Sequence, residues 1–486
     1  MKKSTINEKL DAWIKENRED ILHKWIELAE IPSIKSVAED DAPFGINCKD
    51  ALYKAALYFE KYGFDTKINN NNTYALCSYG QGDKKIGLFS HSDVVPVGDG
   101  WIYTEPFKPV IINDTLIGRG VEDNKSGIMA ALCVFRFLKD NDIRLKNKLE
   151  LFIGSDEECG MGDMKDYLEE EVMPEVSLVP DADFPCSVGE KGIYHLMCES
   201  NSAFDSIAGF DGGEAYNIVL DKVQVSLPCG DAAFFELEKK TKGREDIILR
   251  RENDCITLIF KGIAKHASIP VGSVNAALVA AEFLFDCSFV SDNDKSILRS
   301  VKEMIGCYYG RGMGVEHDDP VFGKTTCVNG ICKVVNGKLQ LSFDIRYGST
   351  QDSDAVEKAG DLTLEKYNFI PLEKDNRPGF SIDENSPYPS VFEDIYEEIT
   401  GVRLNRVTMS GGTYARKLKN AFSIGTYIIK KDRKTPVFEM PDGHGGAHQC
   451  DECIDIEGFF EAVKVLLNYI LACDEQLFLL TRDALQ

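Results

Sequence analysis

Apolar residues recur at helical spacing near the start of the chain. Within residues 8–30 the apolar positions include Leu10, Trp13, Ile14, Ile21, Leu22, Trp25 and Leu28. This three-to-four-residue spacing predicts an amphipathic helix. The sequence Ile31-Pro32-Ser33 should end it, because proline cannot continue a helix.

From residue 50 to residue 160 the pattern alternates between two periods. Segments 51–62 and 126–139 have the helical period, whereas segments 74–78, 85–90 and 148–153 are short apolar runs typical of buried strands. Alternating helices and strands predict an α/β domain with helices packed on a sheet.

Strand-like runs are more frequent between residues 190 and 385, for example at 194–198, 255–260 and 339–345. Gly- and Asp-rich turns separate these runs, and the polar stretch 374–388 resembles a domain boundary. Helical periodicity returns at 388–400 and 456–474. The pattern therefore predicts a second region that is rich in strands and is followed by further helical sequence.

Composition narrows the class of protein. The 486 residues are 43% hydrophobic and 28% charged, which excludes a disordered chain. Lys and Arg number 55 and Asp and Glu number 80, so the net charge is −25. Nucleic acid and anionic membranes require a basic surface, and we therefore expect neither as a partner.

The cysteines and the first twenty residues bear on the cellular compartment. The 15 cysteines are odd in number and scattered, so we interpret them as reduced thiols. Residues 1–20 are charged and contain no apolar core of a signal peptide, and no apolar stretch reaches the roughly 20 residues needed to cross a bilayer. We expect a cytoplasmic location.

Candidate metal ligands follow several predicted elements. His91 and Asp93 come after strand 85–90, where extended backbone would place both on one face. Asp123 lies in the Gly-rich segment 118–127, just before a helix. Taken singly, the first pair could belong to a polar loop, and Asp123 could simply cap the helix.

Further carboxylates and imidazoles occur in similar positions. Glu157 and Glu158 follow strand 148–153, Asp181 follows an apolar segment, and His448 lies in a Gly-rich loop before the last helix. In so acidic a chain, Glu157 and Glu158 could also form an ordinary acidic loop. On chemistry alone, His444 could take the place of His448. Together, however, these imidazoles and carboxylates suit Zn²⁺, Mn²⁺ or Co²⁺ in a two-metal hydrolytic site.

Five motifs in order resemble the co-catalytic dinuclear metallopeptidases, the family of aminoacylases and carboxypeptidase G-like enzymes. The sequence is most similar to the dipeptidase branch, of the PepV and Xaa-His dipeptidase kind. The motifs are His-Ser-Asp-Val-Val-Pro (91–96), Gly-Arg-Gly-Val-Glu-Asp-Asn-Lys-Ser-Gly (118–127), Asp-Glu-Glu-Cys-Gly (156–160), Pro-Asp-Ala-Asp-Phe-Pro (180–185) and Ala-His-Gln-Cys-Asp-Glu (447–452).

The resemblance implies specific roles at the metal site. His91 and Asp181 would bind one metal ion, Glu158 and His448 the other, and Asp123 would bridge both, followed by a cis peptide bond to Asn124. Asp93 would orient His91, and Glu157 would act as the general base. Two features depart from the familiar pattern: the extra carboxylate of Glu122, and Cys450 with Cys453, which we interpret as ordinary thiols and not as a redox motif.

The resemblance also implies an α/β fold of two domains. Residues 1–187 and 386–486 would form a mixed-sheet catalytic domain, and residues 188–385 an inserted α+β lid domain. In the lid, His266 would stabilise the oxyanion, while Arg346 and Asn217 would bind substrate. Thr413, in a catalytic-domain loop, would contact the substrate carboxylate. From the residues alone, His266 could be a polar turn histidine and Arg346 part of an ion pair within the lid.

These inferences lead to one expected function and two alternatives. We expect a metal-dependent dipeptidase that acts on short peptides with a free N-terminus and holds two divalent ions, with zinc favoured over manganese and cobalt. Its partner would be a small peptide substrate, and a monomer is favoured over a dimer. The alternatives are an N-acyl-amino-acid deacylase or desuccinylase of the same family, and a non-catalytic binding protein on this fold.

Overall fold

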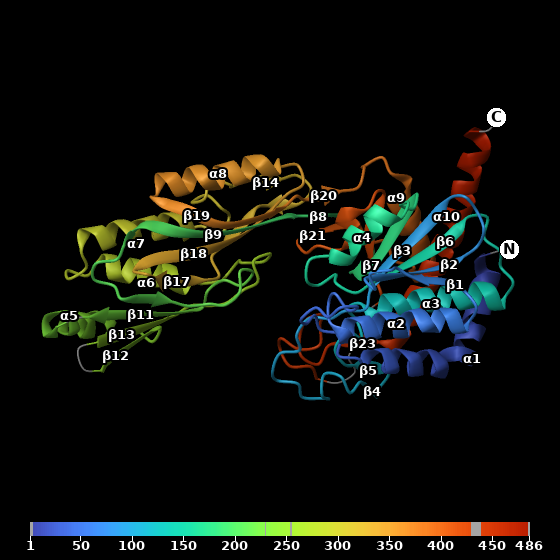
Figure 1. Ribbon diagram of the computed structural model, residues 1–486, viewed down its shortest axis with the longest axis horizontal. Coiled ribbons are helices and arrows are strands. Elements are labelled where there is room, and N and C mark those ends of the chain that lie inside the picture. The colour runs from blue at the N-terminus through green and yellow to red at the C-terminus, as the bar shows by residue number, and fades with distance from the viewer. Residues whose placement is uncertain (1–2, 229, 253–254, 429–438, 485–486) are drawn as a thin grey trace. The chain divides into compact units, whose positions relative to one another are not determined.

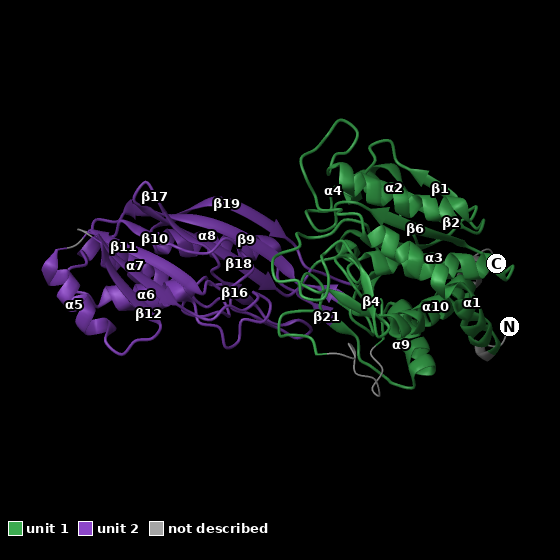
Figure 2. Ribbon diagram, turned by 90° about the horizontal axis from the view of Figure 1, so that it is seen from below, with its two compact units in different colours: residues 1–188, 382–407, 412–486 green, residues 189–381, 408–411 purple. Residues whose placement is uncertain are grey.

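The computed structural model describes residues 3–228, 230–252, 255–428 and 439–484. The chain divides into two compact units, each built around its own hydrophobic core (Figure 2). Unit 1 comprises residues 1–188, 382–407 and 412–486, and unit 2 comprises residues 189–381 and 408–411. Within the described residues, no helix is both long and apolar enough to cross a membrane.

A mixed sheet forms the centre of unit 1 (Figure 1). Its strands in unit 1 are β1 (Asp65–Ile68), β2 (Tyr74–Tyr79), β6 (Lys148–Gly154), β3 (Lys85–His91), β7 (Val176–Ala182) and β22 (Ala421–Gly425), in that spatial order. Strands β6, β3, β7 and β22 are parallel, whereas β1 and β2 pair antiparallel. The predicted α/β class with a mixed sheet is therefore confirmed.

Helices cover this sheet because its strands are apolar on both faces. Leu149, Leu151 and Ile153 of β6 belong to the main core, to which the long helices also contribute. Phe152 points to the other face, where it packs against the rings of Tyr167 and Tyr414. The helices of unit 1 are α1 (Lys3–Ala29), α2 (Ile46–Lys61), α3 (Lys125–Asp140), α4 (Gly162–Glu170), α9 (Pro387–Thr400), the 3-10 helix η1 (Tyr414–Lys417) and α10 (Ile456–Ala484).

A small three-stranded sheet of unit 1 was not predicted from the sequence. It consists of β4 (Val110–Ile112), β5 (Thr115–Ile117) and β23 (Cys453–Asp455), and β23 pairs antiparallel with β5. Strands of three residues are too short to show a recognisable alternation of apolar and polar positions. This sheet joins the end of the His448 loop to the segment that precedes Asp123.

Unit 2 has two sheets with helices packed around a common core. One sheet has the order β10 (Gly209–Asp211), β11 (Lys222–Pro228), β13 (Cys255–Lys261), β12 (Ile247–Glu252). The other has the order β16 (Thr326–Val328), β18 (Lys338–Tyr347), β9 (Gly192–Ala203), β19 (Phe369–Arg377), and β17 (Cys332–Val335) also pairs with β18. The helices are α5 (Asp231–Thr241), α6 (Ala276–Phe285), α7 (Asp292–Ile305) and α8 (Ser353–Lys366).

Short strands complete the secondary structure. Strands β14 (Asp318–Asp319) and β15 (Gly323–Lys324) form a two-stranded ribbon in unit 2. Strands β8 (Ser187–Glu190), β20 (Phe380–Ser381) and β21 (Val407–Met409) occur where the chain passes from one unit to the other.

Candidate metal centre

Three parallel strands deliver acidic and imidazole side chains to one edge of the unit 1 sheet. His91 is the last residue of β3, Asp181 lies near the end of β7, and Glu157 and Glu158 lie three and four residues beyond the end of β6 at Gly154. Because β3 pairs in parallel with both β6 and β7, the carboxyl ends of all three strands meet. Such an edge is the usual position of a binding site in an α/β sheet.

Asp123 connects the two halves of this cluster. One of its carboxylate oxygens, Oδ1, lies 3.1 Å from Nε2 of His91, and the other, Oδ2, lies 3.0 Å from Nε2 of His448. The same nitrogen of His91 lies 3.8 Å from Oδ2 of Asp181, and that of His448 lies 3.2 Å from Oε2 of Glu158. The structure thus brings together all five predicted ligands, with Asp123 between two pairs.

The donor set fits a pair of divalent cations. Ligand atoms about 2.0–2.1 Å from a tetrahedral ion lie roughly 3.3 Å apart, close to the separations measured here. Two groups, His91 with Asp123 and Glu158, and His91 with Glu157 and Asp181, each place their ligand atoms within 4.8 Å of one another. Oε1 of Glu157 and Oε1 of Glu158 are buried and make no hydrogen bond among the described residues. Such buried, unsatisfied donors and acceptors are expected where a ligand or ion binds.

The carboxylate pKa values of this cluster shift in opposite directions, because burial and mutual repulsion raise them and the two imidazoles lower them. Burial, followed by the charge of Asp123, raises the pKa of Glu158 to about 7. Burial also raises the pKa of Glu157 well above its ordinary value, and the nearby Asp181 and Glu158 reinforce that shift. For Asp123, burial is outweighed by hydrogen bonds from His448 and His91, which lower its pKa. Hydrogen bonds to Asp123 and Glu158 raise the pKa of His448 to about 11.

Asp93 supports the ligands mainly through its contact with backbone amides. Its two carboxylate oxygens accept hydrogen bonds from the N–H groups of Glu157 and Glu158, each at 3.2 Å. Nδ1 of His91 lies 3.0 Å from the backbone carbonyl oxygen of Asp93 and 3.5 Å from its carboxylate. Asp93 therefore contacts His91 chiefly through its carbonyl group, while its carboxylate fixes the loop that carries both glutamates.

Asn124 and Glu452 also shape the site, although sequence reasoning assigned them no such role. The peptide bond from Asp123 to Asn124 is cis, as the resemblance implies. Nδ2 of Asn124 donates to Oδ1 of Asp181 at 2.8 Å. The buried carboxylate of Glu452 accepts hydrogen bonds from Nη1 of Arg119 at 2.7 Å and from the backbone N–H groups of residues 120, 122 and 123 at 2.9–3.1 Å. Glu452 thereby holds the Asp123 loop in place.

The remaining residues of the His448 loop serve the loop itself. Nδ1 of His444 lies 2.7 Å from the carboxylate of Asp451. The histidine that lies beside Asp123 is His448. Sγ of Cys450 donates to the carbonyl oxygen of Asp99 at 3.1 Å, and Sγ of Cys453 donates to that of Gly445 at 3.4 Å. All cysteines of the described part of the chain are free thiols.

Three predicted lid residues lie in unit 2. His266 is exposed, and its Nδ1 lies 2.7 Å from Oγ of Ser268. The backbone carbonyl of Asn217 accepts from the N–H of Ala267, next to His266, at 2.8 Å. The guanidinium of Arg346 donates to both carboxylate oxygens of Asp344, so it makes the ion pair that the residues alone had left open.

Thr413 lies in unit 1 and is 2% exposed. Its hydroxyl oxygen accepts from the N–H of Ala415 at 3.1 Å and lies 2.9 Å from Oγ of Ser423. The hydroxyl therefore caps helix η1 inside the unit.

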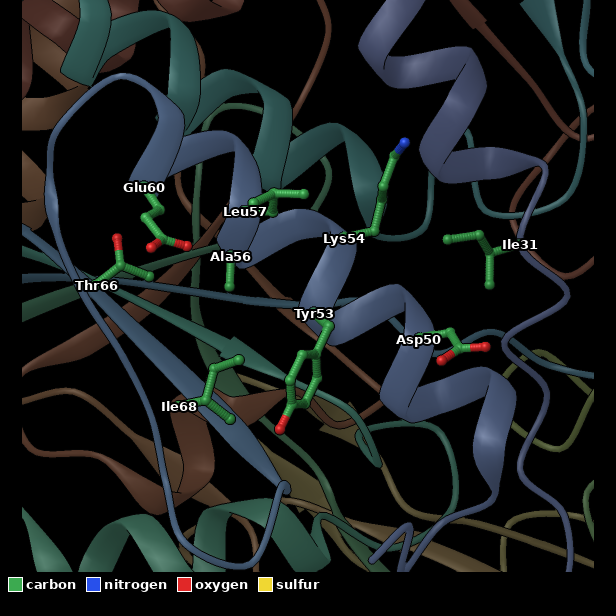
Figure 3. Close-up of a pocket in the computed structure, with 9 residues that line it drawn as sticks. All are labelled: Ile31, Asp50, Tyr53, Lys54, Ala56, Leu57, Glu60, Thr66 and Ile68. Carbon is green, nitrogen blue, oxygen red and sulfur yellow. The ribbon is translucent and has the colours of Figure 1, made fainter.

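A separate groove of about 620 Å³ runs along the outside of unit 1, between helix α2 and the edge strand β1. Tyr53 and Leu57 of α2 and Ile68 of β1 line it, together with the charged Lys54 and Glu60 (Figure 3). None of the predicted site residues lines this groove, so its location differs from that of the candidate metal centre.

Comparison with known proteins agrees with the geometry. The model of "Peptidase family M20/M25/M40" matches residues 87–472. "Putative dipeptidase YtjP" of Bacillus subtilis (strain 168) is 29% identical over 472 residues, which cover 93% of this chain and 97% of that protein.

Solved structures show the same fold at low sequence identity. Human carnosine dipeptidase 1 has a TM-score of 0.59 at 13% identity, covering 96% of this chain and 98% of its own. The dipeptidase Dug1p of Saccharomyces cerevisiae has a TM-score of 0.57 at 13% identity, covering 98% of this chain and 99% of its own. With the family model matching well over half of its residues, the chain is a hydrolase that belongs to peptidase family M20/M25/M40.

Proposed function

We propose that this protein is a metal-dependent dipeptidase that cleaves short peptides with a free N-terminus. The observation that carries the proposal is the bridging position of Asp123, whose two oxygens face two separate ligand pairs. The relative YtjP, which matches almost the full length of the chain, is named as a dipeptidase and supports the choice of substrate.

His91 and Asp181 would hold one divalent cation and Glu158 and His448 the other, with Asp123 shared between them. Imidazole and carboxylate ligands suit Zn²⁺ first, with Mn²⁺ and Co²⁺ as alternatives. Such a pair of ions would polarise the scissile carbonyl and lower the pKa of the attacking water.

Glu157 is the residue we assign to proton transfer. Its side chain is buried, and its Oε1 makes no hydrogen bond among the described residues. The raised pKa of Glu157 suits a carboxylate that takes a proton from the attacking water and donates it to the leaving amine. Asp93 holds the backbone of Glu157, which keeps the base in place.

Unit 2 would act as the lid of this enzyme. We propose that His266 donates a hydrogen bond to the oxyanion of the tetrahedral intermediate, and that Arg346 and Asn217 bind the substrate. For Thr413, the buried hydroxyl favours a role in shaping the loop whose backbone would meet the substrate carboxylate. A cytoplasmic location and a monomeric state stay predictions.

An activity panel tests the proposal directly. The purified protein should be stripped with a chelator, reloaded separately with Zn²⁺, Mn²⁺ or Co²⁺, and assayed on dipeptides alongside acetyl- and succinyl-amino acids. We expect hydrolysis of dipeptides only after reloading. Faster turnover of the acylated amino acids would favour the deacylase alternative, and no turnover of any substrate with any of the three ions would refute a hydrolytic role in peptide metabolism.

A further inference from the structure

The sheet of unit 2 that contains β16, β18, β9 and β19 has one apolar and one polar face. Along β18, Phe343 and Ile345 point into the core of unit 2, so the alternating Asp344 and Arg346 point to the opposite face. His195 of β9 is the direct cross-strand partner of Asp344 and lies on that same face. Asp344 is nevertheless fully buried, and Arg346 is 6% exposed.

Arg346 is held rigidly by this face. Its Nε and Nη2 donate to the two carboxylate oxygens of Asp344 at 2.6 and 2.8 Å, and its Nη1 donates to the carbonyl oxygen of Ser410 at 2.8 Å. A guanidinium has five N–H donors, so these bonds occupy three and leave two for a ligand carboxylate. The pair is bidentate, the geometry that fixes the plane of an arginine most firmly.

His195 contacts both Asp344 and Tyr216, and so links β18 to the segment that contains Tyr216. Its Nε2 lies 3.2 Å from Oδ2 of Asp344, the oxygen that also accepts from Nη2 of Arg346. The face of the imidazole stacks on the ring of Tyr216, with a centroid distance of 4.9 Å and an interplanar angle of 29°. Tyr216 immediately precedes Asn217, the second predicted substrate-binding residue.

The segment that carries Tyr216 and Asn217 has little freedom to shift. A side chain at Gly330 would collide with the backbone carbonyl oxygens of Ala215 and Tyr216, so the two stretches of chain are in close contact there. The carbonyl of Asn217 also accepts from the N–H of Ala267, beside His266. One continuous set of contacts therefore joins Arg346, Asn217 and the His266 segment.

We propose that Asp344 and His195 are positioning residues that fix the Arg346 guanidinium for the substrate's C-terminal carboxylate and set its place relative to Asn217. The inference rests on the proposed function, since it assigns Arg346 to the carboxylate of a short peptide. Neither positioning residue touches the substrate. Each restricts the Arg346 side chain before the substrate binds. Less conformational entropy is then lost on binding, which is how a preorganised site gains affinity.

The electrostatics agree with this arrangement. Burial by itself would raise the pKa of Asp344, but the hydrogen bonds with His195 and Arg346 lower it instead. The carboxylate is thus held charged by the two groups that it joins. Without the His195 contact, the orientation of this carboxylate would be fixed by Arg346 alone.

The test compares the metal-loaded wild type with His195→Phe, His195→Gln and Asp344→Asn. Phenylalanine keeps a ring to stack on Tyr216 but loses the N–H donor, whereas glutamine keeps an N–H donor. His317→Gln is the matched control, because this histidine is exposed and lies in the same unit. Each enzyme is assayed on a dipeptide and on the same dipeptide with its C-terminal carboxylate blocked as an amide.

We expect His195→Phe and Asp344→Asn to raise KM for the free dipeptide about tenfold, which corresponds to one weakened hydrogen bond to a charged group. KM for the amide and kcat for both substrates should change less than about twofold, because the amide lacks the carboxylate that Arg346 would bind. His195→Gln should recover most of the loss, and His317→Gln should match the wild type.

Other outcomes overturn the inference in distinguishable ways. An equal loss on both substrates, or a loss confined to kcat, would assign His195 and Asp344 a merely structural role. A wild type that hydrolyses the dipeptide and its amide equally well would refute the carboxylate role while the dipeptidase function stands. A wild type inactive on every dipeptide would refute the proposed function and this inference with it. If His195→Phe does not fold, Asp344→Asn decides between the same outcomes.

Discussion

Glu452 should matter as much for stability as for metal binding, and Glu452→Gln tests this. The carboxylate is fully buried and accepts four hydrogen bonds, two on each oxygen. Glutamine has nearly the same shape but only one oxygen, so its NH₂ group must face two of the four donors. Because glutamine is neutral, the buried ion pair with Arg119 is lost in either orientation, which costs about 3–5 kcal/mol. If the NH₂ group faces the N–H groups of residues 122 and 123, two buried donors lose their acceptor at about 1–3 kcal/mol each.

Both orientations therefore predict a loss of at least about 3 kcal/mol in the free energy of unfolding of unit 1. A loosened Asp123 loop should also weaken metal binding about 10- to 100-fold, the usual effect of removing a residue that supports a metal ligand. The three tryptophans, Trp13, Trp25 and Trp101, all lie in unit 1, so urea unfolding followed by tryptophan fluorescence reports on this unit alone.

The matched control is Glu457→Gln, which removes a partly exposed carboxylate paired with Arg18 at 2.6 Å. This change should cost less than about 1 kcal/mol, because surface ion pairs contribute little. Metal affinity is measured by competition with a chromogenic chelator. If Glu452→Gln unfolded within about 1 kcal/mol of the wild type and bound metal with unchanged affinity, Glu452 would not organise the Asp123 loop.

Three further predictions follow from the metal centre. Glu157→Gln should lower kcat about 10²- to 10⁴-fold and leave the metal content unchanged, as measured by elemental analysis, because it removes the proposed base but no ligand. Asp93→Asn should weaken metal binding about tenfold, since one N–H of the glutamate loop then faces an amide NH₂. The metal-free protein should lose stability between pH 6.5 and about 11, because folded His448, with its pKa raised to about 11, keeps a proton that the unfolded chain releases near 6.5. Urea unfolding at pH 6.5 and 9 should show this loss, and His448→Gln should reduce it.

The parts of the fold that the sequence predicts are those with long, regular patterns. The predicted strand 85–90 is Lys85–His91 in the structure, and the predicted helix 126–139 is Lys125–Asp140. Both are buried on nearly all sides, so their apolar runs are continuous. The convergence of His91, Glu158 and Asp181 could be anticipated for a related reason, because each lies at or just beyond the carboxyl end of a strand.

Other features depend on contacts that no local pattern encodes. Glu452 lies 329 to 333 residues from the loop it supports, and its motif gave no sign of that contact. The choice between His448 and His444 depended on which imidazole the loop turns toward Asp123. For Arg346, the residues alone could not decide between an ion pair and a ligand contact, and the structure shows the ion pair with donors to spare.

The carboxylates that support the metal centre show why long-range contacts of this kind cannot be predicted from the sequence. Asp93, Asp163 and Glu452 each accept hydrogen bonds from backbone N–H groups of a segment at the metal centre: residues 157 and 158, residues 155 and 156, and residues 120, 122 and 123 respectively. Every residue except proline offers such a donor, so the sequence of the supported segment carries no signal of its partner. In a chain of net charge −25, the accepting residue is equally inconspicuous. Part of the acidity that looks like surface charge therefore lies buried, where it holds the backbone of the metal centre.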